Sequence, residues 1–318
     1  MQIDLKKDIQ KYWLFLFLII LLVLMALFKI SLNEILETVS HLKVWQLLLL
    51  VFIYFAISLS LILSRKYLLY YLSATPTTRN LVYIHFSTMA AHYSTPAKLG
   101  FPLAVYLLKK FEDIPYSTGT AMILIELIVN TGICGLIALI GSFFYFTLDS
   151  LVLLYLFLSL FAIFVLAYFV GRYMMHRSRR NGRIYQFVKN IVEAFSRISW
   201  DKLTCYGFIT TFIQLLGSIN LVLLARFFSA DLSLFQSLVA NSTAFFLGAL
   251  SMVPMGLGVR EASMLFYLHH MGLRNEVGLS IVTIQRLLST GLSFVLGAIF
   301  ASVLGLKNTS QTTNSVNE

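Results

Sequence analysis

Long apolar stretches dominate this chain and restrict what it can fold into. Hydrophobic residues make up 58% of the sequence and charged residues only 12%, so a water-facing surface would have to be built from Leu, Ile and Phe. The sequence therefore predicts an all-α polytopic membrane protein. We expect full spans where an apolar stretch can cross the roughly 30 Å of hydrocarbon in a bilayer, at 12–30, 45–63, 116–147, 149–171, 203–227 and 277–306.

Two further apolar stretches, 81–109 and 235–271, are each interrupted near the middle by proline and glycine. Both interruptions contain the pattern P-x-x-L-G, in STPAKLGFPLAVYLLKK and in MVPMGLGVREASMLFYLHH. A broken helix is tolerated in a membrane only where the freed backbone faces protein or a water-filled cavity. We therefore expect two re-entrant hairpins instead of two further spans.

The distribution of basic residues supports the hairpins. If each hairpin enters and leaves on the same side, every basic cluster falls on the cytoplasmic side, as the positive-inside rule requires. The connections at 147–150 and 228–234 carry no basic residue and fall outside. The basic clusters are the N-terminus, 64–80, Lys109 with Lys110, and 172–202.

This topology makes the two halves of the chain an inverted repeat, with 45–147 beginning outside and 203–306 beginning inside. We expect one integral membrane domain over 1–306 in the plasma (inner) membrane, with both termini cytoplasmic. The segment 172–202 is expected to be a basic cytoplasmic loop that faces anionic lipid headgroups, and 307–318 a polar flexible tail. Because the basic residues lie in short loops between apolar runs, the net charge of +10 does not indicate nucleic-acid binding.

The hairpin tips mark the candidate site, because paired broken helices place a transporter's substrate site near the bilayer midplane. A charged residue there costs about 2.5–3.5 kcal/mol, so such residues usually are paired, face a cavity or serve a function. The half-helix after the second tip offers free N–H groups and a positive dipole end, which together with Arg260 suit a phosphate oxygen. An internal ion pair of Arg260 with Glu261 or Glu126 is the alternative. The residues predicted at the tips are Lys98 and Gly100 in the first, and Gly256, Gly258, Arg260 and Glu261 in the second.

The long apolar run after each hairpin carries a charge. Glu126 lies one helical turn before Asn130 in one repeat, and Arg286 lies in the other. These residues predict either a salt bridge across the pseudo-two-fold axis or a pair that relays substrate and protons.

Several patterns support weaker expectations. Gln214 and Asn241 are expected to line a path or to form interhelical hydrogen bonds, and the stripe Ser293, Gly297 and Ala301 predicts a packing face that also suits a homo-oligomer. His85 and His92 lack a carboxylate at metal-ligand spacing, so no metal site is expected. Nucleotide and hydrolase motifs are absent from the sequence, so no cofactor and no catalytic residue is predicted.

The stretch VPMGLGVREASMLFYL with IQRLLS resembles the second motif of the lysylphosphatidylglycerol synthase transmembrane family, the flippase-like integral membrane proteins. STPAKLGFPLAVYLLKK with LIELIVN resembles the first, and the likeness covers roughly 10–305. The first motif of that family commonly has an acidic residue after the glycine and an arginine shortly beyond, where this chain has Phe101 and Ala104. The second motif is intact in Gly258, Arg260, Glu261 and Arg286, and Glu126 is retained from the first.

The resemblance implies translocation of an anionic or aminoacylated phospholipid, or of a polyprenyl-phosphate-linked sugar, between leaflets. Family members that synthesise aminoacylated phosphatidylglycerol carry a large soluble transferase domain after the membrane region. Here only a short polar tail follows, so synthesis is not expected. A membrane-embedded headgroup or glycosyl transferase and a non-catalytic accessory subunit of envelope assembly are the alternatives.

Overall fold

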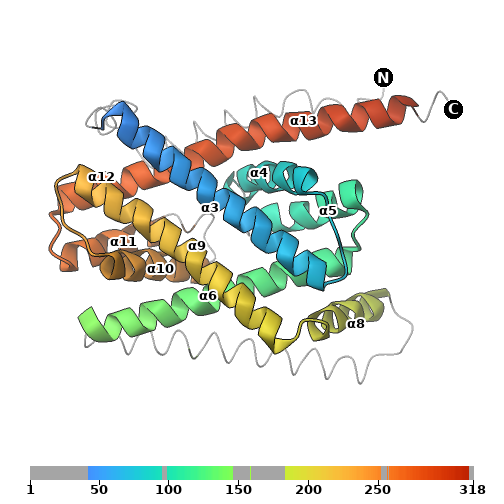
Figure 1. Cartoon of the computed structure of the whole chain (residues 1–318), viewed down its shortest axis with the longest axis horizontal. Coiled ribbons are helices and arrows are strands. Elements are labelled where there is room, and N and C mark those ends of the chain that lie inside the picture. Colours follow the sequence, from blue (N-terminus) through green and yellow to red (C-terminus); the bar gives the residue numbers. More distant parts are fainter. Residues whose placement is uncertain are drawn as a thin grey trace.

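The computed structural model describes residues 42–94, 99–145, 158, 183–251, 256 and 258–314. Every regular element in these residues is a helix (Figure 1), so the all-α polytopic fold is confirmed. The helical segments that are long and apolar enough to cross a membrane confirm four of the expected spans; they are Val44–Tyr71, Tyr116–Tyr145, Trp200–Phe227 and Asn275–Leu304. The expected spans 12–30 and 149–171 lie outside the described residues, apart from Leu158.

The two halves of the chain contain the same series of helices. The first half comprises α3 (Val44–Tyr71), α4 (Thr78–Ser94), α5 (Gly100–Glu112) and α6 (Tyr116–Tyr145). The second comprises α9 (Trp200–Phe227), α10 (Leu234–Leu250), α11 (Val259–His270) and then α12 (Asn275–Arg286), which continues through a π-helix (Leu287–Gly291) into α13 (Leu292–Asn314). The paired helices also agree in length, with 28 residues in both α3 and α9 and 17 in both α4 and α10.

The two halves are arranged around a pseudo-two-fold axis that lies nearly along the view of Figure 1. The helices α3 and α9 cross the centre side by side in opposite directions, and α6 and α13 run along opposite edges of the molecule. Each edge helix packs on the first arm of the other half's hairpin, α6 on α10 and α13 on α4. The halves are therefore interlocked, as expected for an inverted repeat.

Both interrupted stretches fold back on themselves, as predicted. The arms α4 and α5 pack against each other, as do α10 and α11, and the two hairpins lie in opposite halves of the view (Figure 1). Glycine permits this close approach, because a Cβ on Gly100 would lie 2.6 Å from the Cβ of His92. In the second hairpin Gly256 has a φ of +64°, and a Cβ there would lie 2.8 Å from the Cα of Gly248.

Three described helices extend beyond, or were absent from, the predicted elements. The first described span continues to Tyr71, beyond the expected end at 63, because no proline or glycine interrupts the chain there. Within the expected loop 172–202, residues Arg183–Ser196 form an additional helix, α8. The last helix reaches Asn314, into the stretch expected to be a flexible tail.

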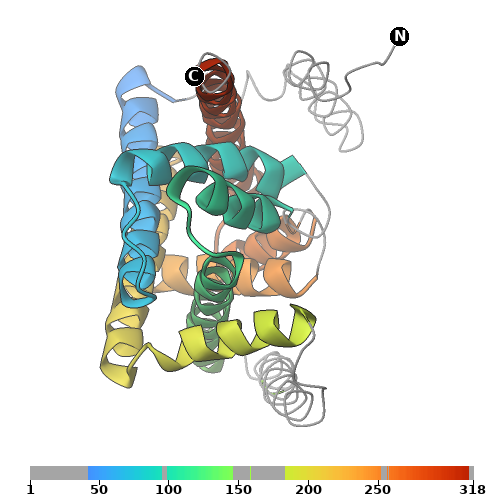
Figure 2. The ribbon, with the colours of Figure 1, turned by 90° about the vertical axis from the view of Figure 1, so that its right-hand side faces the viewer.

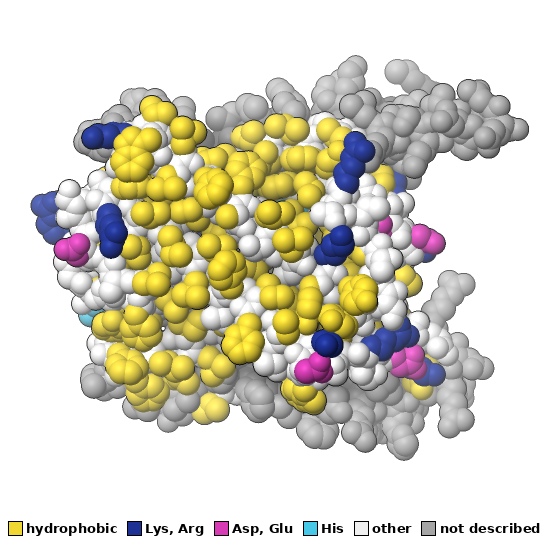
Figure 3. Space-filling view, viewed as in Figure 1, with side chains coloured by type: hydrophobic (Ala, Val, Ile, Leu, Met, Phe, Trp, Pro, Cys, Tyr) yellow, Lys and Arg dark blue, Asp and Glu magenta, His cyan; other side chains and the backbone are white. Residues whose placement is uncertain are grey.

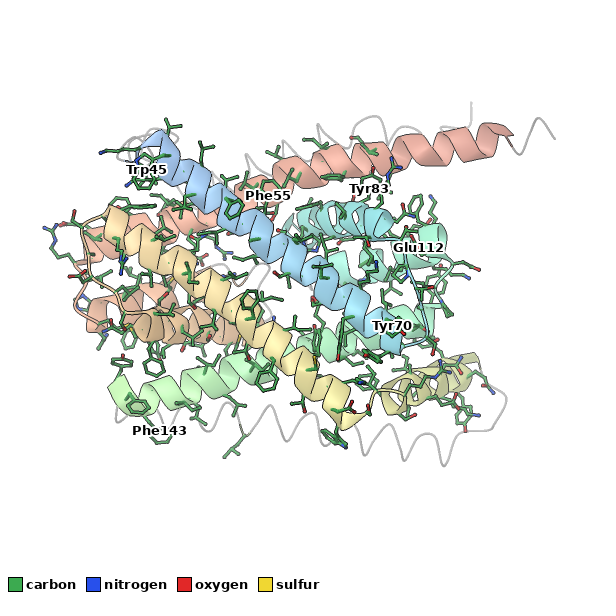
Figure 4. The ribbon with its side chains drawn as sticks, viewed as in Figure 1. Trp45, Phe55, Tyr70, Tyr83, Glu112 and Phe143 are labelled. Atoms are coloured by element: carbon green, nitrogen blue, oxygen red, sulfur yellow. The ribbon has the colours of Figure 1, made fainter. Side chains whose placement is uncertain are left out.

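The buried apolar side chains fall mainly into two clusters, and each cluster draws on both halves, with Tyr206 of α9 in the first and Leu50 of α3 in the second. One cluster of buried side chains gathers around Leu68, Leu108 and Met122, and another around Leu224 and Ile281. The surface between the ends is also apolar, with Lys, Arg, Asp and Glu concentrated towards the two ends of the long helices (Figure 3). Large aromatic side chains, Trp45 and Phe143 at one end and Tyr70 and Tyr83 at the other, mark both ends (Figure 4), as in the aromatic belts of membrane proteins.

The contact of α13 with α4 depends on Gly297. A Cβ at this position would lie 2.5 Å from the Cβ of Ala90 and 3.0 Å from the carbonyl oxygen of Phe86. The neighbouring Ser293 is buried and shares a hydrogen bond of 2.8 Å with the hydroxyl of Tyr54. The stripe of small residues predicted at Ser293 and Gly297 therefore packs within the chain, while a homo-oligomer stays a prediction.

We expect Gly297→Ala to destabilise the protein by about 1–3 kcal/mol, because the methyl group meets a helix backbone that cannot move away freely. Thermal unfolding of the purified protein in detergent measures this change. Gly132→Ala is the matched control, since a Cβ at that position in α6 meets nothing within 4 Å. Equal unfolding temperatures for the two variants would contradict the tight α4–α13 contact.

Candidate functional site

A buried ion pair joins the first and fourth helices of the first half, α3 and α6. The guanidinium of Arg65 on α3 donates from Nε to Oε2 and from Nη2 to Oε1 of Glu126 on α6, both at 2.9 Å. The Arg65 and Glu126 side chains are only 9% and 13% exposed, and Nη1 of Arg65 lies 3.3 Å from Nδ1 of His85 on α4. This bidentate geometry suits a charge that is removed from water.

The sequence analysis missed Arg65, because the predicted span ended at 63 and placed this residue in a cytoplasmic loop. The ion pairs predicted for Glu126 were also wrong. The sequence suggested Arg260 or Arg286 as its partner, whereas Glu126 pairs with Arg65 and Arg286 pairs with Glu261. The available signal was the position of Arg65 directly after an apolar run without a helix breaker. A longer helix would have carried it into the protein, where a carboxylate is needed to offset its charge.

A second ion pair lies at the start of the second hairpin's returning arm. Arg286, the last residue of α12, donates from Nε to Oε1 of Glu261 on α11. The other carboxylate oxygen, Oε2, accepts a hydrogen bond of 2.8 Å from the backbone N–H of Gly258, the N-cap of α11. Glu261 therefore occupies the positive end of this helix, where a negative charge is favoured.

The two ion pairs differ in their access to solvent. The side chains of Arg286 and Glu261 are 16% and 26% exposed, and both line a small pocket of about 220 Å³, a volume that includes its open mouth. Its wall contains Arg260, Glu261, Met264, Val282, Gln285, Arg286 and Ser289. The pocket thus combines two arginines and a helix N-terminus, which are groups that bind anions. The carboxylate of Glu261 already contacts Arg286 and this N-terminus, so an incoming anion has to displace it.

The π-helix directly follows Arg286 and alters the face that the next residues present. Ser293 donates to the carbonyl oxygen of Ser289 at 2.6 Å and contacts Tyr54 of α3, whereas Arg286 faces α11. A single π-turn inside an α-helix commonly accompanies a functional site. Here it allows one long helix to contact both the hairpin and the central helix α3.

A chain of amides links the two halves near the centre. The Nε2 of Gln214 on α9 donates to Oδ1 of Asn130 on α6 at 2.8 Å, and Nδ2 of Asn241 on α10 donates to Oε1 of Gln214 at 3.4 Å. Cys134 donates to the same Asn130 oxygen at 3.7 Å. The two amide–amide contacts are interhelical hydrogen bonds, one of the two roles expected for Gln214 and Asn241, whereas the Cys134 contact lies within α6.

The structure brings some of the predicted site residues together and leaves others apart. Gly258, Arg260, Glu261 and Arg286 form one cluster, with Gly256 packed against Gly248 beside it. The first hairpin contributes Gly100 as a packing contact with His92, and Glu126 and Asn130 belong to the separate interactions described above. Lys98 lies outside the described residues.

These features define a polytopic membrane protein built from two matching halves, each with a hairpin and an embedded arginine–glutamate pair. The family model of the lysylphosphatidylglycerol synthase TM region matches residues 12–297. Because this range covers most of the chain, the protein belongs to that family, and the resemblance inferred from the two motifs is confirmed. None of the curated proteins compared with the chain matches it.

We expect Glu126→Ala to destabilise the protein by about 3–5 kcal/mol, because it leaves the Arg65 guanidinium buried without its carboxylate. Glu261→Ala should cost less, since the Arg286–Glu261 pair is more exposed than the Arg65–Glu126 pair. Thermal unfolding in detergent measures both changes, and Lys109→Ala, which removes an exposed ion pair with Asp113, serves as the surface control. Equal losses for Glu126→Ala and Glu261→Ala would contradict the distinction between a sealed and an accessible pair.

Proposed function

We propose that this protein moves a lipid with an anionic headgroup between leaflets: an anionic or aminoacylated phospholipid, or a polyprenyl-phosphate-linked sugar. The observation that carries the proposal is the pocket at the start of α11, where Arg260 and Arg286 surround a helix N-terminus. A lipid phosphate offers the charge and the acceptor oxygens that such a site binds. Membership of a lipid-related membrane family supports the same substrate class.

In the proposed mechanism, the carboxylate of Glu261 occupies the phosphate-binding position while no substrate is bound. Its two oxygens accept from Gly258 and Arg286, and these are the donors that a phosphate needs. An arriving headgroup displaces the carboxylate and takes over both contacts, with Arg260 as a further cation. Lys98 of the first P-x-x-L-G motif is, from the sequence, a further candidate cation in this proposal.

The interlocked halves suggest how access alternates. The antiparallel pair α3 and α9 forms the centre of the molecule, and each edge helix packs on the other half's hairpin (Figure 1). We propose that one half rocks against the other about this centre, so that the pocket opens to one leaflet and then to the other. The sealed Arg65–Glu126 pair keeps the first half rigid during this motion.

The carboxylates support transport over headgroup transfer. A transferase that uses a carboxylate as its base needs that group within reach of its substrate and not held as the counter-ion of a resident arginine. Both oxygens of Glu126 accept from Arg65, and both oxygens of Glu261 accept from other donors. We therefore propose that the protein translocates the lipid without a chemical step. In this proposal it lies in the plasma membrane, and the end of the molecule that carries the basic segment 172–202 is cytoplasmic.

Transport is tested by reconstituting the protein in liposomes that contain a fluorescent anionic phospholipid and following its exchange between leaflets. We expect Arg260→Ala and Arg286→Ala each to slow exchange on the order of tenfold or more, since a hydrogen bond to a charged group contributes about 1.5–3 kcal/mol. Arg274→Ala, at the N-cap of α12, is the matched control and should exchange at the wild-type rate. Wild-type exchange no faster than in protein-free liposomes would overturn the proposal, and a new lipid species in the same liposomes would indicate a transferase.

If the Glu261 carboxylate competes with the lipid phosphate for the same donors, removing its charge should strengthen lipid binding. Glu261→Gln removes the competing charge and should lower the fraction of anionic lipid that gives half-maximal exchange by about tenfold. Glu126→Gln is the control, because it alters an ion pair that does not line the α11 pocket; it should lower the unfolding temperature and leave the half-maximal fraction unchanged. A higher half-maximal fraction in Glu261→Gln would show that the carboxylate assists substrate binding instead of competing with it.

A further inference from the structure

The helix α8 (Arg183–Ser196) has one apolar and one polar face. Its apolar face packs on the first half of the molecule, with Ala194 buried and Ile191 and Phe195 against the same core as α6. Three residues then connect α8 to α9. Because α8 packs on one half of the molecule and is joined covalently to the other, it links the two halves at this end.

The helix lies across the direction of the membrane spans. In Figure 2 the helices α6 and α13 are seen nearly end-on, whereas α8 runs along the plane of the picture. In Figure 1 it lies beside the end of α6 from which that helix begins. An amphipathic helix that lies across the ends of spanning helices is at the depth of the lipid headgroups.

Two apolar side chains at the edges of the packed face remain uncovered. Phe187 is 40% exposed and Val192 is 38% exposed, and Trp200, just beyond the helix, is 83% exposed. Lys189, which pairs with Glu193 at 3.6 Å, is exposed, and so is Arg197, one residue beyond the end of the helix. This arrangement of apolar and cationic groups matches a surface with acyl chains on one side and negative phosphates on the other.

The surroundings of α8 place it in a cationic and aromatic layer. Arg79 lies over the ring of Tyr83 at 5.6 Å, and Lys202 lies over the ring of Tyr71 at 5.3 Å. Such combinations of tyrosine with lysine or arginine are typical of the membrane–water interface. The described segments at this end hold eight basic residues (Lys66, Arg79, Lys109, Lys110, Arg183, Lys189, Arg197 and Lys202) against four acidic ones (Glu112, Asp113, Glu193 and Asp201).

We propose that α8 is an interfacial helix that binds anionic phospholipids of the leaflet around it. Phe187 and Val192 enter the upper acyl region, while Lys189 and Arg197 contact phosphate groups. The excess of positive charge favours an anionic lipid surface over a zwitterionic one, because each lysine or arginine near such a surface strengthens association by about fivefold. This surface is separate from the α11 pocket, so lipid binding by α8 does not depend on the proposed transport.

Lipid selectivity is tested with the full-length protein in nanodiscs of phosphatidylcholine, with and without phosphatidylglycerol. We expect hydrogen exchange of the α8 amides to slow when phosphatidylglycerol is present, and the double variant Lys189→Gln with Arg197→Gln to lose most of this difference. The matched control, Arg226→Gln with Arg274→Gln at the opposite end of the molecule, should keep it. Exchange of α8 that is equally fast in both nanodiscs would overturn the proposal and would favour a protein partner for this face.

The depth of α8 is measured by tryptophan quenching with lipids that carry a quencher high on the acyl chain. Relative to the parent protein, Phe187→Trp should show strong additional quenching, whereas Ser196→Trp on the polar face should show little. Equal quenching of the two added tryptophans would contradict the proposed orientation. Both substitutions are at exposed positions, and an unchanged unfolding temperature confirms that each variant is folded.

Discussion

Within the hydrocarbon of a bilayer, every polar backbone group and every charge must find its partner inside the protein, because no water is present to serve as an alternative. The two hairpins make this constraint severe, since each breaks a helix inside the apolar part of the molecule. The structure meets it by packing each hairpin arm tightly on its neighbours, with glycine at the closest contacts. Gly297 against Ala90 and Gly256 against Gly248 are therefore as important to the fold as any large apolar side chain.

The same constraint governs the embedded charges, and the two halves meet it differently. In the first half Arg65 satisfies both oxygens of Glu126, and the pair is almost fully enclosed. In the second half Arg286 shares Glu261 with the N-terminus of α11, and the pair borders a pocket. Two halves with the same series of helices thus carry two different ion pairs: an enclosed one that stabilises the fold and one at a pocket, where a ligand can compete for the arginine. This difference is the physical basis of the proposed lipid-binding role of the second hairpin.

The interlocked arrangement also sets limits on movement. Each edge helix belongs to one half but packs on the hairpin of the other, so any rocking of one half against the other has to rearrange these two contacts. The long helix that runs from α12 through the π-helix into α13 contacts the hairpin α11, the central helix α3 and the arm α4. A change at the Glu261–Arg286 pair is therefore mechanically connected to both halves of the molecule.

The helical spans, the two hairpins and the cluster of Arg260, Glu261 and Arg286 followed from the sequence alone. The length of an apolar run, a proline–glycine break and a charge within an apolar run can each be read from a short stretch of sequence. In a bilayer they indicate a span, a hairpin enclosed by protein and an embedded polar site, respectively. The helix α8 was missed although its apolar residues recur at helical spacing, because charge density dominated the interpretation of 172–202.

The partners of the charges were decided only by the tertiary structure. Glu126 lies 61 residues from Arg65 and 160 from Arg286 along the chain, and nothing in the sequence distinguishes these two arginines as its partner. The crossing of α3 with α6 brings Arg65 to Glu126, and the turn between α11 and α12 brings Arg286 to Glu261. The sequence determined that charges are embedded in the membrane part of this protein, whereas helix packing determined which pair is sealed and which remains accessible, because burial depends on neighbours that are distant in the chain.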